Sequence, residues 1–205
     1  MRAVDLPTVH SERKSELGMQ DDADAIAAAV AAVEGPVTVV AHSYGGVPTT
    51  QGALDPRVDH IVYIAAFVLD AGESLLGAVG GVAPEWWNID GALATAGNDT
   101  TPAEQLFFGD VEASVAKAAA ARLLPQSERA FRDVVSEVAW RDRPTTYIVT
   151  GRDEVFPLPA QEALAARSGS TVVPLDTSHS PFLSQPEAVA DIIERAASGE
   201  GVMRG

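Results

Sequence analysis

The chain contains no cysteine, so disulfide bonds and thiol catalysis are excluded at the outset. Its four histidines show neither close pairing nor the spacing of zinc ligands, which argues against a structural metal site. No apolar run approaches the roughly 20 residues of a membrane-spanning helix. The first residues lack the apolar core of a signal peptide. We therefore expect a cytoplasmic protein that does not associate with membranes.

Positive charge is also scarce. Fourteen lysines and arginines stand against 29 aspartates and glutamates, which gives a net charge of −15. Such an excess of negative charge disfavours nucleic acid and anionic lipid as partners. Hydrophobic residues, in contrast, make up 46% of the 205 positions, enough for one globular domain with an ample core. We expect a small molecule as the partner, and self-association into a homo-oligomer stays open.

The most informative stretch runs from Pro36 to Gly46 and reads P-V-T-V-V-A-H-S-Y-G-G. Its valine-rich first half is typical of a buried parallel strand. A serine, Ser43, then lies between small residues two positions before and after it, and a helix is expected to follow. This pattern predicts a tight strand-to-helix turn that exposes the serine hydroxyl. The backbone N–H of Tyr44, at the helix start, would face a developing oxyanion.

Strands and helices are expected to alternate around this turn. We expect strands at residues 2–6, 37–40, 59–67, 145–150 and 171–175. Helices are expected from Asp21 or Asp22 to Val33, over residues 44–54 and 159–166, and after a capping box at Ser184. This alternation predicts an α/β protein whose mostly parallel sheet carries helices on both faces.

The strand rhythm stops between residues 68 and 140, a segment that holds all three tryptophans. We expect a helical cap here, inserted into a core formed by residues 1–67 and 141–205, although a plain crossover with core aromatics is an alternative. Apolar residues in and beside this segment are candidates either for substrate contact or for the core: Phe67, Trp86, Trp87, Phe107, Phe108 and Leu123.

Two further chemical groups follow later strands. Asp153 comes directly after the strand at 145–150, and His179 lies on the loop after the strand at 171–175. Because ligands of parallel sheets bind beyond the carboxyl ends of the strands, both should meet Ser43 there. The order Ser, Asp, His is that of a nucleophile, an orienting acid and a general base. Asp70, after the strand at 59–67, is the alternative acid.

Several of these stretches together resemble the α/β-hydrolase fold, in the small-esterase branch that includes plant methylesterases and hydroxynitrile lyases. The matching segments are A-H-S-Y-G-G at 41–46, V-Y-I-A-A-F at 62–67, F-F-G-D at 107–110, Arg152-Asp153, and S-H-S-P-F at 178–182. The resemblance implies hydrolysis of small esters under a helical cap, with no metal or cofactor. In the lyases a lysine follows the catalytic histidine, whereas Ser180 occupies that position here, which favours hydrolysis.

The resemblance also has a gap at the start of the chain. Relatives of this fold have an apolar strand and a His-Gly loop before the segment that matches residues 2–7, and that loop donates a second oxyanion N–H. Without that strand, we expect either a gap in the sheet or an exposed apolar edge at residues 37–40. The explanations left open are a longer native protein, a first strand that closes beside the strand at 37–40, or a partner chain.

The sequence therefore predicts a serine hydrolase that cleaves a small carboxylic ester or a related acyl substrate. Ser43, His179 and Asp153 would be the catalytic residues, and Tyr44 would supply the oxyanion donor. The alternatives are a non-catalytic protein that binds a small ligand in the same pocket, and cofactor-free lyase or perhydrolase chemistry.

Overall fold

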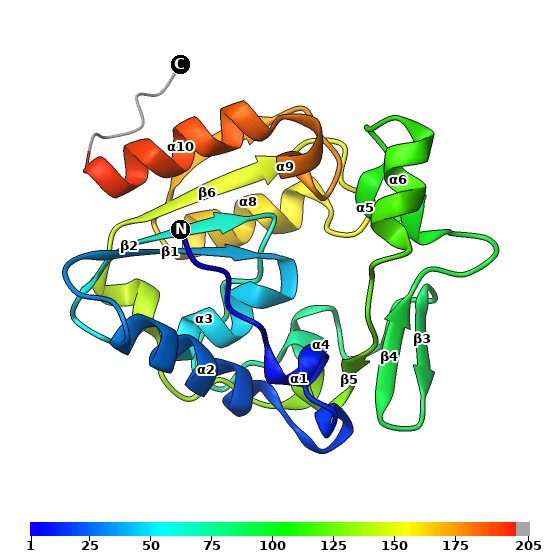
Figure 1. Cartoon of the computed structure of the whole chain (residues 1–205), viewed down its shortest axis with the longest axis horizontal. Helices are drawn as coiled ribbons and strands as arrows, with labels where there is room; N and C mark the ends of the chain where they lie inside the picture. Colours follow the sequence, from blue (N-terminus) through cyan, green and yellow to red (C-terminus); the bar gives the residue numbers. More distant parts are fainter. Residues whose placement is uncertain (200–205) are drawn as a thin grey trace.

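The protein is built around a four-stranded parallel sheet, seen in a computed structural model that describes residues 1–199. The strand order is β1 (Val37–His42), β2 (Val58–Ile64), β6 (Thr145–Thr150) and β7 (Thr171–Leu175). Neighbouring strands pair in parallel throughout, so all their carboxyl ends reach the same edge of the sheet (Figure 1). The predicted fold class, an α/β protein with helices on both faces, is confirmed.

One face of the sheet is covered by the last helix, α10 (Pro186–Ser198), which crosses the top of Figure 1. Successive side chains of a strand point to opposite faces, so Val62, Ile64 and Ile148 lie on this face together. They form a buried cluster with Val189, Ile192 and Ala196, which share one side of α10. The expected capping box is wrong, because Gln185 is the N-cap residue and no side chain caps the helix.

The opposite face carries three helices, α2 (Met19–Ala31), α3 (Gly46–Gly52) and α8 (Leu158–Arg167). The alternate strand residues, among them Ile61, Tyr63 and Tyr147, are fully buried on this side. Between them the two faces form a three-layer α/β arrangement, which holds the carboxyl edge of the sheet rigid.

The start of the chain differs from expectation in two ways. Residues 1–6 form no strand, and the short helix α1 (Pro7–His10) and the 3₁₀ turn η1 (Lys14–Glu16) follow them. β1 is consequently an edge strand of the sheet, and Val40 on it is 39% exposed. The exposed apolar edge expected from the sequence is therefore present. The alternative, in which a first strand closes beside β1, is not found in residues 1–199.

Helix α2 also begins earlier than expected. Gly18 is its N-cap residue, and the Gly18 N–H donates to the carboxylate of Asp21 at 2.8 Å. Asp22 is therefore not the N-cap residue but lies in the first turn of the helix, and its side chain is buried.

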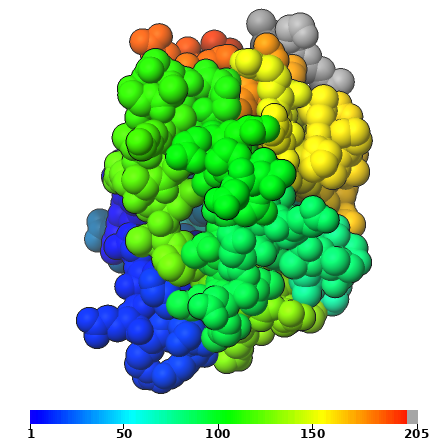
Figure 2. Space-filling view, turned by 90° about the vertical axis from the view of Figure 1, so that its right-hand side faces the viewer, coloured from blue at the N-terminus to red at the C-terminus, as the bar shows by residue number. Residues whose placement is uncertain are grey.

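Residues 68–140 contain more than helices. They comprise short helices and a three-stranded antiparallel sheet that the sequence did not predict. The strands are β3 (Trp87–Asp90), β4 (Leu93–Ala96) and β5 (Gln126–Ser127), and the helices are α4 (Leu75–Ala78), α5 (Ala103–Phe108), α6 (Ala113–Ala120) and α7 (Arg129–Arg132). A 3₁₀ turn, η3 (Ala139–Asp142), leads into β6. Figure 2 shows that this green segment covers most of the face of the molecule at the carboxyl edge of the sheet.

Among residues 1–199, no helix combines the length and apolar character needed to cross a membrane.

Candidate active site

Ser43 lies where β1 ends, as the first residue of a 3₁₀ turn, η2 (Ser43–Gly45), that leads directly into α3. Its backbone has φ 53°, in the left-handed region that residues other than glycine rarely adopt. Such a conformation costs on the order of 1–3 kcal/mol and persists only where its surroundings enforce it. Here the Ser43 carbonyl accepts a hydrogen bond from the Phe67 N–H at 3.2 Å, which ties the turn to the end of β2.

The turn requires a small residue at Gly46 rather than at Gly45. A Cβ on Gly46 would lie 2.2 Å from the carbonyl oxygen of Phe67, whereas a Cβ on Gly45 would meet no atom within 4 Å. The sequence reasoning placed the crowding two residues after the serine. The structure moves it one residue further, to the point where α3 passes the end of β2.

Asp153 follows β6, and four close hydrogen bonds surround its carboxylate. Oδ1 accepts from the N–H groups of Val155 and Phe156, both at 2.8 Å. Oδ2 accepts from the Thr150 hydroxyl at 2.7 Å and lies 2.7 Å from His179 Nδ1. Burial alone would raise the pKa of Asp153, but these donors and the nearby imidazole hold it below its ordinary value. The carboxylate is therefore ionised and fixed in place.

This contact determines the state of His179. A carboxylate only accepts hydrogen bonds, so His179 Nδ1 carries a proton, and in the neutral imidazole Nε2 then keeps its lone pair. The His179 side chain is fully buried, and within residues 1–199 its Nε2 has no hydrogen-bond partner. No hydrogen bond joins Nε2 to the Ser43 hydroxyl in this part of the chain, as is common in enzymes without bound substrate.

His42 connects the end of β1 to the His179 loop. His42 Nε2 lies 2.8 Å from the His179 carbonyl oxygen, and the two imidazole rings are 4.6 Å apart. Burial, followed by the neighbouring His179, lowers the pKa of His42 to about 3. His42 is therefore neutral at physiological pH and donates its Nε2 proton to that carbonyl. Through this bond, the residue before Ser43 is attached directly to the backbone of His179.

Residues 68–140 contribute to the same region from the other side. The Phe107 ring lies 5.5 Å from the His179 ring, and Asp110, just after α5, accepts two hydrogen bonds from Ser178. The Ser178 N–H donates at 3.0 Å and its hydroxyl at 2.5 Å. The loop that carries His179 is therefore held by residues 68–140 as well as by the sheet.

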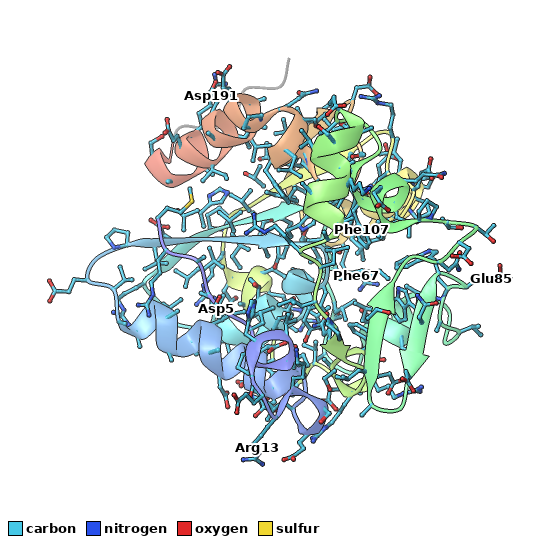
Figure 3. All side chains as sticks on the ribbon, turned by 45° about the vertical axis from the view of Figure 1, so that its right-hand side comes forward. Asp5, Arg13, Phe67, Glu85, Phe107 and Asp191 are labelled. Carbon is cyan, nitrogen blue, oxygen red and sulfur yellow. The ribbon has the colours of Figure 1, made fainter. Side chains whose placement is uncertain are left out.

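A cavity of about 350 Å³ opens beside Ser43. Its wall carries no charged side chain and few polar ones, and five of the six predicted contact residues belong to it: Phe67, Trp86, Trp87, Phe107 and Leu123. Two of these wall residues, Phe67 after β2 and Phe107 on α5, are labelled in Figure 3. Phe108 is not part of the cavity wall and is buried beside Phe107, with their rings 5.9 Å apart.

The other acid considered from the sequence lies elsewhere. Asp70 pairs with Arg141 on the surface, and it makes no hydrogen bond to His179 within residues 1–199. Asp153 occupies the position beside the imidazole instead.

Sequence reasoning missed two groups near the turn. The Tyr44 hydroxyl donates to the buried carboxylate of Asp22 at 2.7 Å, and Asp110 binds Ser178. No local pattern marks Asp22, because an acidic residue near a helix start is usually a cap. Asp110 lies in the segment F-F-G-D noted for its resemblance, but its hydrogen bonds cross 68 residues and leave no signal in the spacing.

A parallel sheet with a serine on a strained strand-to-helix turn, beside a histidine bound to a buried carboxylate, is typical of the α/β-hydrolase class. A family model described as "Alpha/beta hydrolase family" matches residues 2–192. The chain belongs to this family of enzymes, as its sequence resemblance predicted.

Individual relatives agree with this assignment. A probable hydrolase, R7, from Phoma sp. is 31% identical over 194 residues, which cover 87% of this chain and 78% of that protein. Among solved structures, a pyrethroid hydrolase from Sphingobium faniae has a TM-score of 0.77 at 22% identity, covering 95% of this chain and 86% of its own. A methylesterase from Arabidopsis has a TM-score of 0.72 at 20% identity, covering 95% and 84%. At these identities the two structures establish a shared fold.

Proposed function

We propose that the protein is a serine hydrolase that cleaves a small, uncharged carboxylic ester. Ser43 is the nucleophile, His179 the general base and Asp153 the residue that orients the imidazole. The observation that carries this proposal is the buried His179, whose Nδ1 binds the Asp153 carboxylate and whose ring lies 4.6 Å from that of His42, the residue before Ser43. The link from His42 to the His179 carbonyl gives further support.

In the first half of the reaction, Ser43 Oγ attacks the ester carbonyl carbon and His179 Nε2 takes the hydroxyl proton. The imidazolium that forms is stabilised by the ionised Asp153 at 2.7 Å. Negative charge develops on the former carbonyl oxygen, where the Tyr44 N–H at the turn is the proposed donor. As the tetrahedral intermediate collapses, His179 returns the proton to the departing alcohol.

In the second half, His179 removes a proton from water, which attacks the acyl group on Ser43. The same donors stabilise the second tetrahedral intermediate, and the acid leaves as Ser43 recovers its proton. Every proton taken by His179 is returned within the cycle, so these steps need no further reactant besides water.

The proposed substrate class follows from the cavity wall. A substrate carboxylate or ammonium in this cavity would lose its hydration without gaining a partner, which costs several kcal/mol. Aromatic and aliphatic side chains suit an apolar acyl or alcohol group of modest size. We propose that residues 68–140 act as a cap that supplies most of this wall, among them Trp86, Trp87, Phe107 and Leu123.

The nucleophile is tested with a fluorophosphonate probe and with p-nitrophenyl butyrate as substrate. We expect the probe to label wild type at the peptide containing Ser43 and to leave Ser43→Ala unlabelled, with hydrolysis lowered at least about 10³-fold. Ser114→Ala, an exposed serine on α6, is the matched control and should behave as wild type. Labelling that survives Ser43→Ala would refute the assignment. A wild type that neither labels nor hydrolyses esters would favour a binding protein.

The substrate class is tested separately by comparing p-nitrophenyl butyrate with the p-nitrophenyl ester of succinate, which carries a free carboxylate. Burying that charge without a partner predicts a kcat/KM at least about 100-fold lower for the succinate ester. Equal kcat/KM values for the two esters would contradict the proposal that the uncharged cavity wall excludes charged substrates.

A further inference from the structure

Asp22 is a buried acid that the proposed mechanism does not use. It lies in the first turn of helix α2 with 0% of its surface exposed, and within residues 1–199 it forms no ion pair. Acidic residues are almost never fully buried without a partner, because the loss of hydration is costly. The first turn of a helix favours negative charge, but an exposed carboxylate would gain that stabilisation without losing its hydration. The burial of Asp22 therefore carries a cost that its place in the helix does not explain.

Three hydrogen bonds compensate part of that cost, and the Asp22 carboxylate is the acceptor in all of them. The Thr8 N–H donates to Oδ1 at 2.9 Å, and the Thr8 hydroxyl donates to Oδ2 at 2.6 Å. The third donor is the Tyr44 hydroxyl, 2.7 Å from Oδ2. Because only acceptors are needed at all three contacts, the arrangement suits a carboxylate rather than an amide.

Tyr44 is the residue that follows Ser43, and its N–H is the proposed oxyanion donor. Its side chain is held on one side by Asp22 and on the other by the Phe131 ring, at 5.6 Å in an edge-to-face arrangement. Burial and the neighbouring carboxylate raise the pKa of Tyr44 well above its ordinary value, so the hydroxyl remains a donor. The Ser43 backbone is strained, so the turn depends on such outside contacts to keep its conformation.

We propose that Asp22 is a positioning residue for catalysis, which accepts the Tyr44 hydroxyl and so fixes the peptide unit whose N–H stabilises the oxyanion. This inference rests on the proposed hydrolase function. A ring held only by apolar contacts can shift along its neighbours, whereas a hydrogen bond to a buried carboxylate defines one position. Catalysis through a preformed donor is sensitive to displacements well below the size of an atom.

The contact set extends to the cavity wall. Gln126, on β5, lines the cavity and donates through Nε2 to the Thr8 hydroxyl at 3.1 Å. The Thr8 hydroxyl has one proton, which it gives to Asp22, so its lone pairs remain for Gln126. The chain of bonds therefore runs from the insertion through Thr8 and Asp22 to the residue beside the nucleophile.

The test compares Tyr44→Phe, which removes only the hydroxyl, with Asp22→Asn and with the double variant, using p-nitrophenyl butyrate. We expect Tyr44→Phe to lower kcat about 10-fold and to leave KM within about twofold. This is less than the 10²–10³-fold loss for deleting a whole oxyanion donor, because the donor is displaced and not removed. Since Asp22 acts through the Tyr44 hydroxyl, the double variant should lose no more activity than the more impaired single variant.

The matched control is Thr145→Val, at the start of β6 and far from the carboxyl edge, where a buried threonine also loses hydroxyl hydrogen bonds. Thr145→Val should lose about as much thermal stability as Tyr44→Phe does, while its kcat stays at the wild-type value. The second readout is a trifluoromethyl ketone, whose adduct carries an oxyanion and whose affinity should fall with kcat in Tyr44→Phe.

Two results would overturn the inference: a wild-type kcat for Tyr44→Phe, or losses in Asp22→Asn and Tyr44→Phe that multiply in the double variant. If Asp22→Asn fails to fold, the comparison of kcat between Tyr44→Phe and Thr145→Val still tests the role of the Tyr44 hydroxyl. Failure of the proposed function is distinguishable, because it appears as the absence of labelling at Ser43 in wild type.

Discussion

The half-buried His42 predicts a specific loss of stability in acid. In the unfolded chain, a histidine takes up a proton near its ordinary pKa of 6.5, whereas in the folded protein the pKa of His42 is about 3. Between these values the unfolded state binds more protons than the folded state does. The free energy of unfolding therefore falls as the pH drops below 6.5, and the stability that a neutral His42 provides is complete only above it.

The magnitude follows from the interval between the two pKa values. Each pH unit within it is worth about 1.4 kcal/mol, so lowering the pH from about 7 to about 5 removes at most about 2 kcal/mol. His42 is half-buried, so solvent screens part of the effect and this figure is an upper value. For a domain of this size, it corresponds to a fall of several degrees in melting temperature.

The measurement is urea denaturation at both pH values, followed by tryptophan fluorescence, on wild type and His42→Gln. Glutamine keeps a donor toward the His179 carbonyl but cannot titrate, while all other ionisable groups are common to both proteins. We expect the stability difference between them to shift by about 1–2 kcal/mol in favour of His42→Gln at about pH 5. A difference that is the same at both pH values would refute the neutral state of His42.

Two further predictions concern the turn and the acid. Gly46→Ala forces a Cβ to 2.2 Å from the Phe67 carbonyl oxygen and should destabilise the fold by about 1–3 kcal/mol. Gly45→Ala, where a Cβ meets nothing within 4 Å, should be neutral or slightly stabilising, and equal melting temperatures for the two variants would contradict the crowding argument. Asp153→Asn should lower kcat about 10³–10⁴-fold while circular dichroism shows a folded protein, because the amide no longer selects the imidazole tautomer with a free Nε2. Retention of more than about a tenth of the activity would argue for another acid.

The sequence was sufficient for the parts of the molecule in which local pattern and tertiary structure agree. The strands at 145–150 and 171–175 were predicted with the bounds that the structure has, because both are apolar runs closed by turn residues. The placement of Asp153 and His179 followed from the rule that parallel strands present their carboxyl ends at one edge. Neither step requires knowledge of long-range packing.

Prediction failed where distant contacts decide the outcome. The Arg2–Leu6 stretch has the composition of a strand but pairs with no other strand, so no strand forms. In the small sheet, β5 has only two residues, too few for a pattern, and it pairs with β4 more than 30 residues earlier. β3 and β4 form a local hairpin that sequence reasoning missed, although a short turn joins its strands. Asp22 resembled a helix cap because its true partners, Thr8 and Tyr44, lie 14 and 22 residues away.

The double hydrogen bond from Ser178 to Asp110 has a consequence for engineering. Exchanging the proposed cap for another would be one way to alter selectivity, yet Asp110 in that segment also holds the loop that carries the proposed base, His179. A transplanted segment that lacked this acid would alter turnover as well as substrate choice, so recombination boundaries should fall beyond position 110 or preserve it.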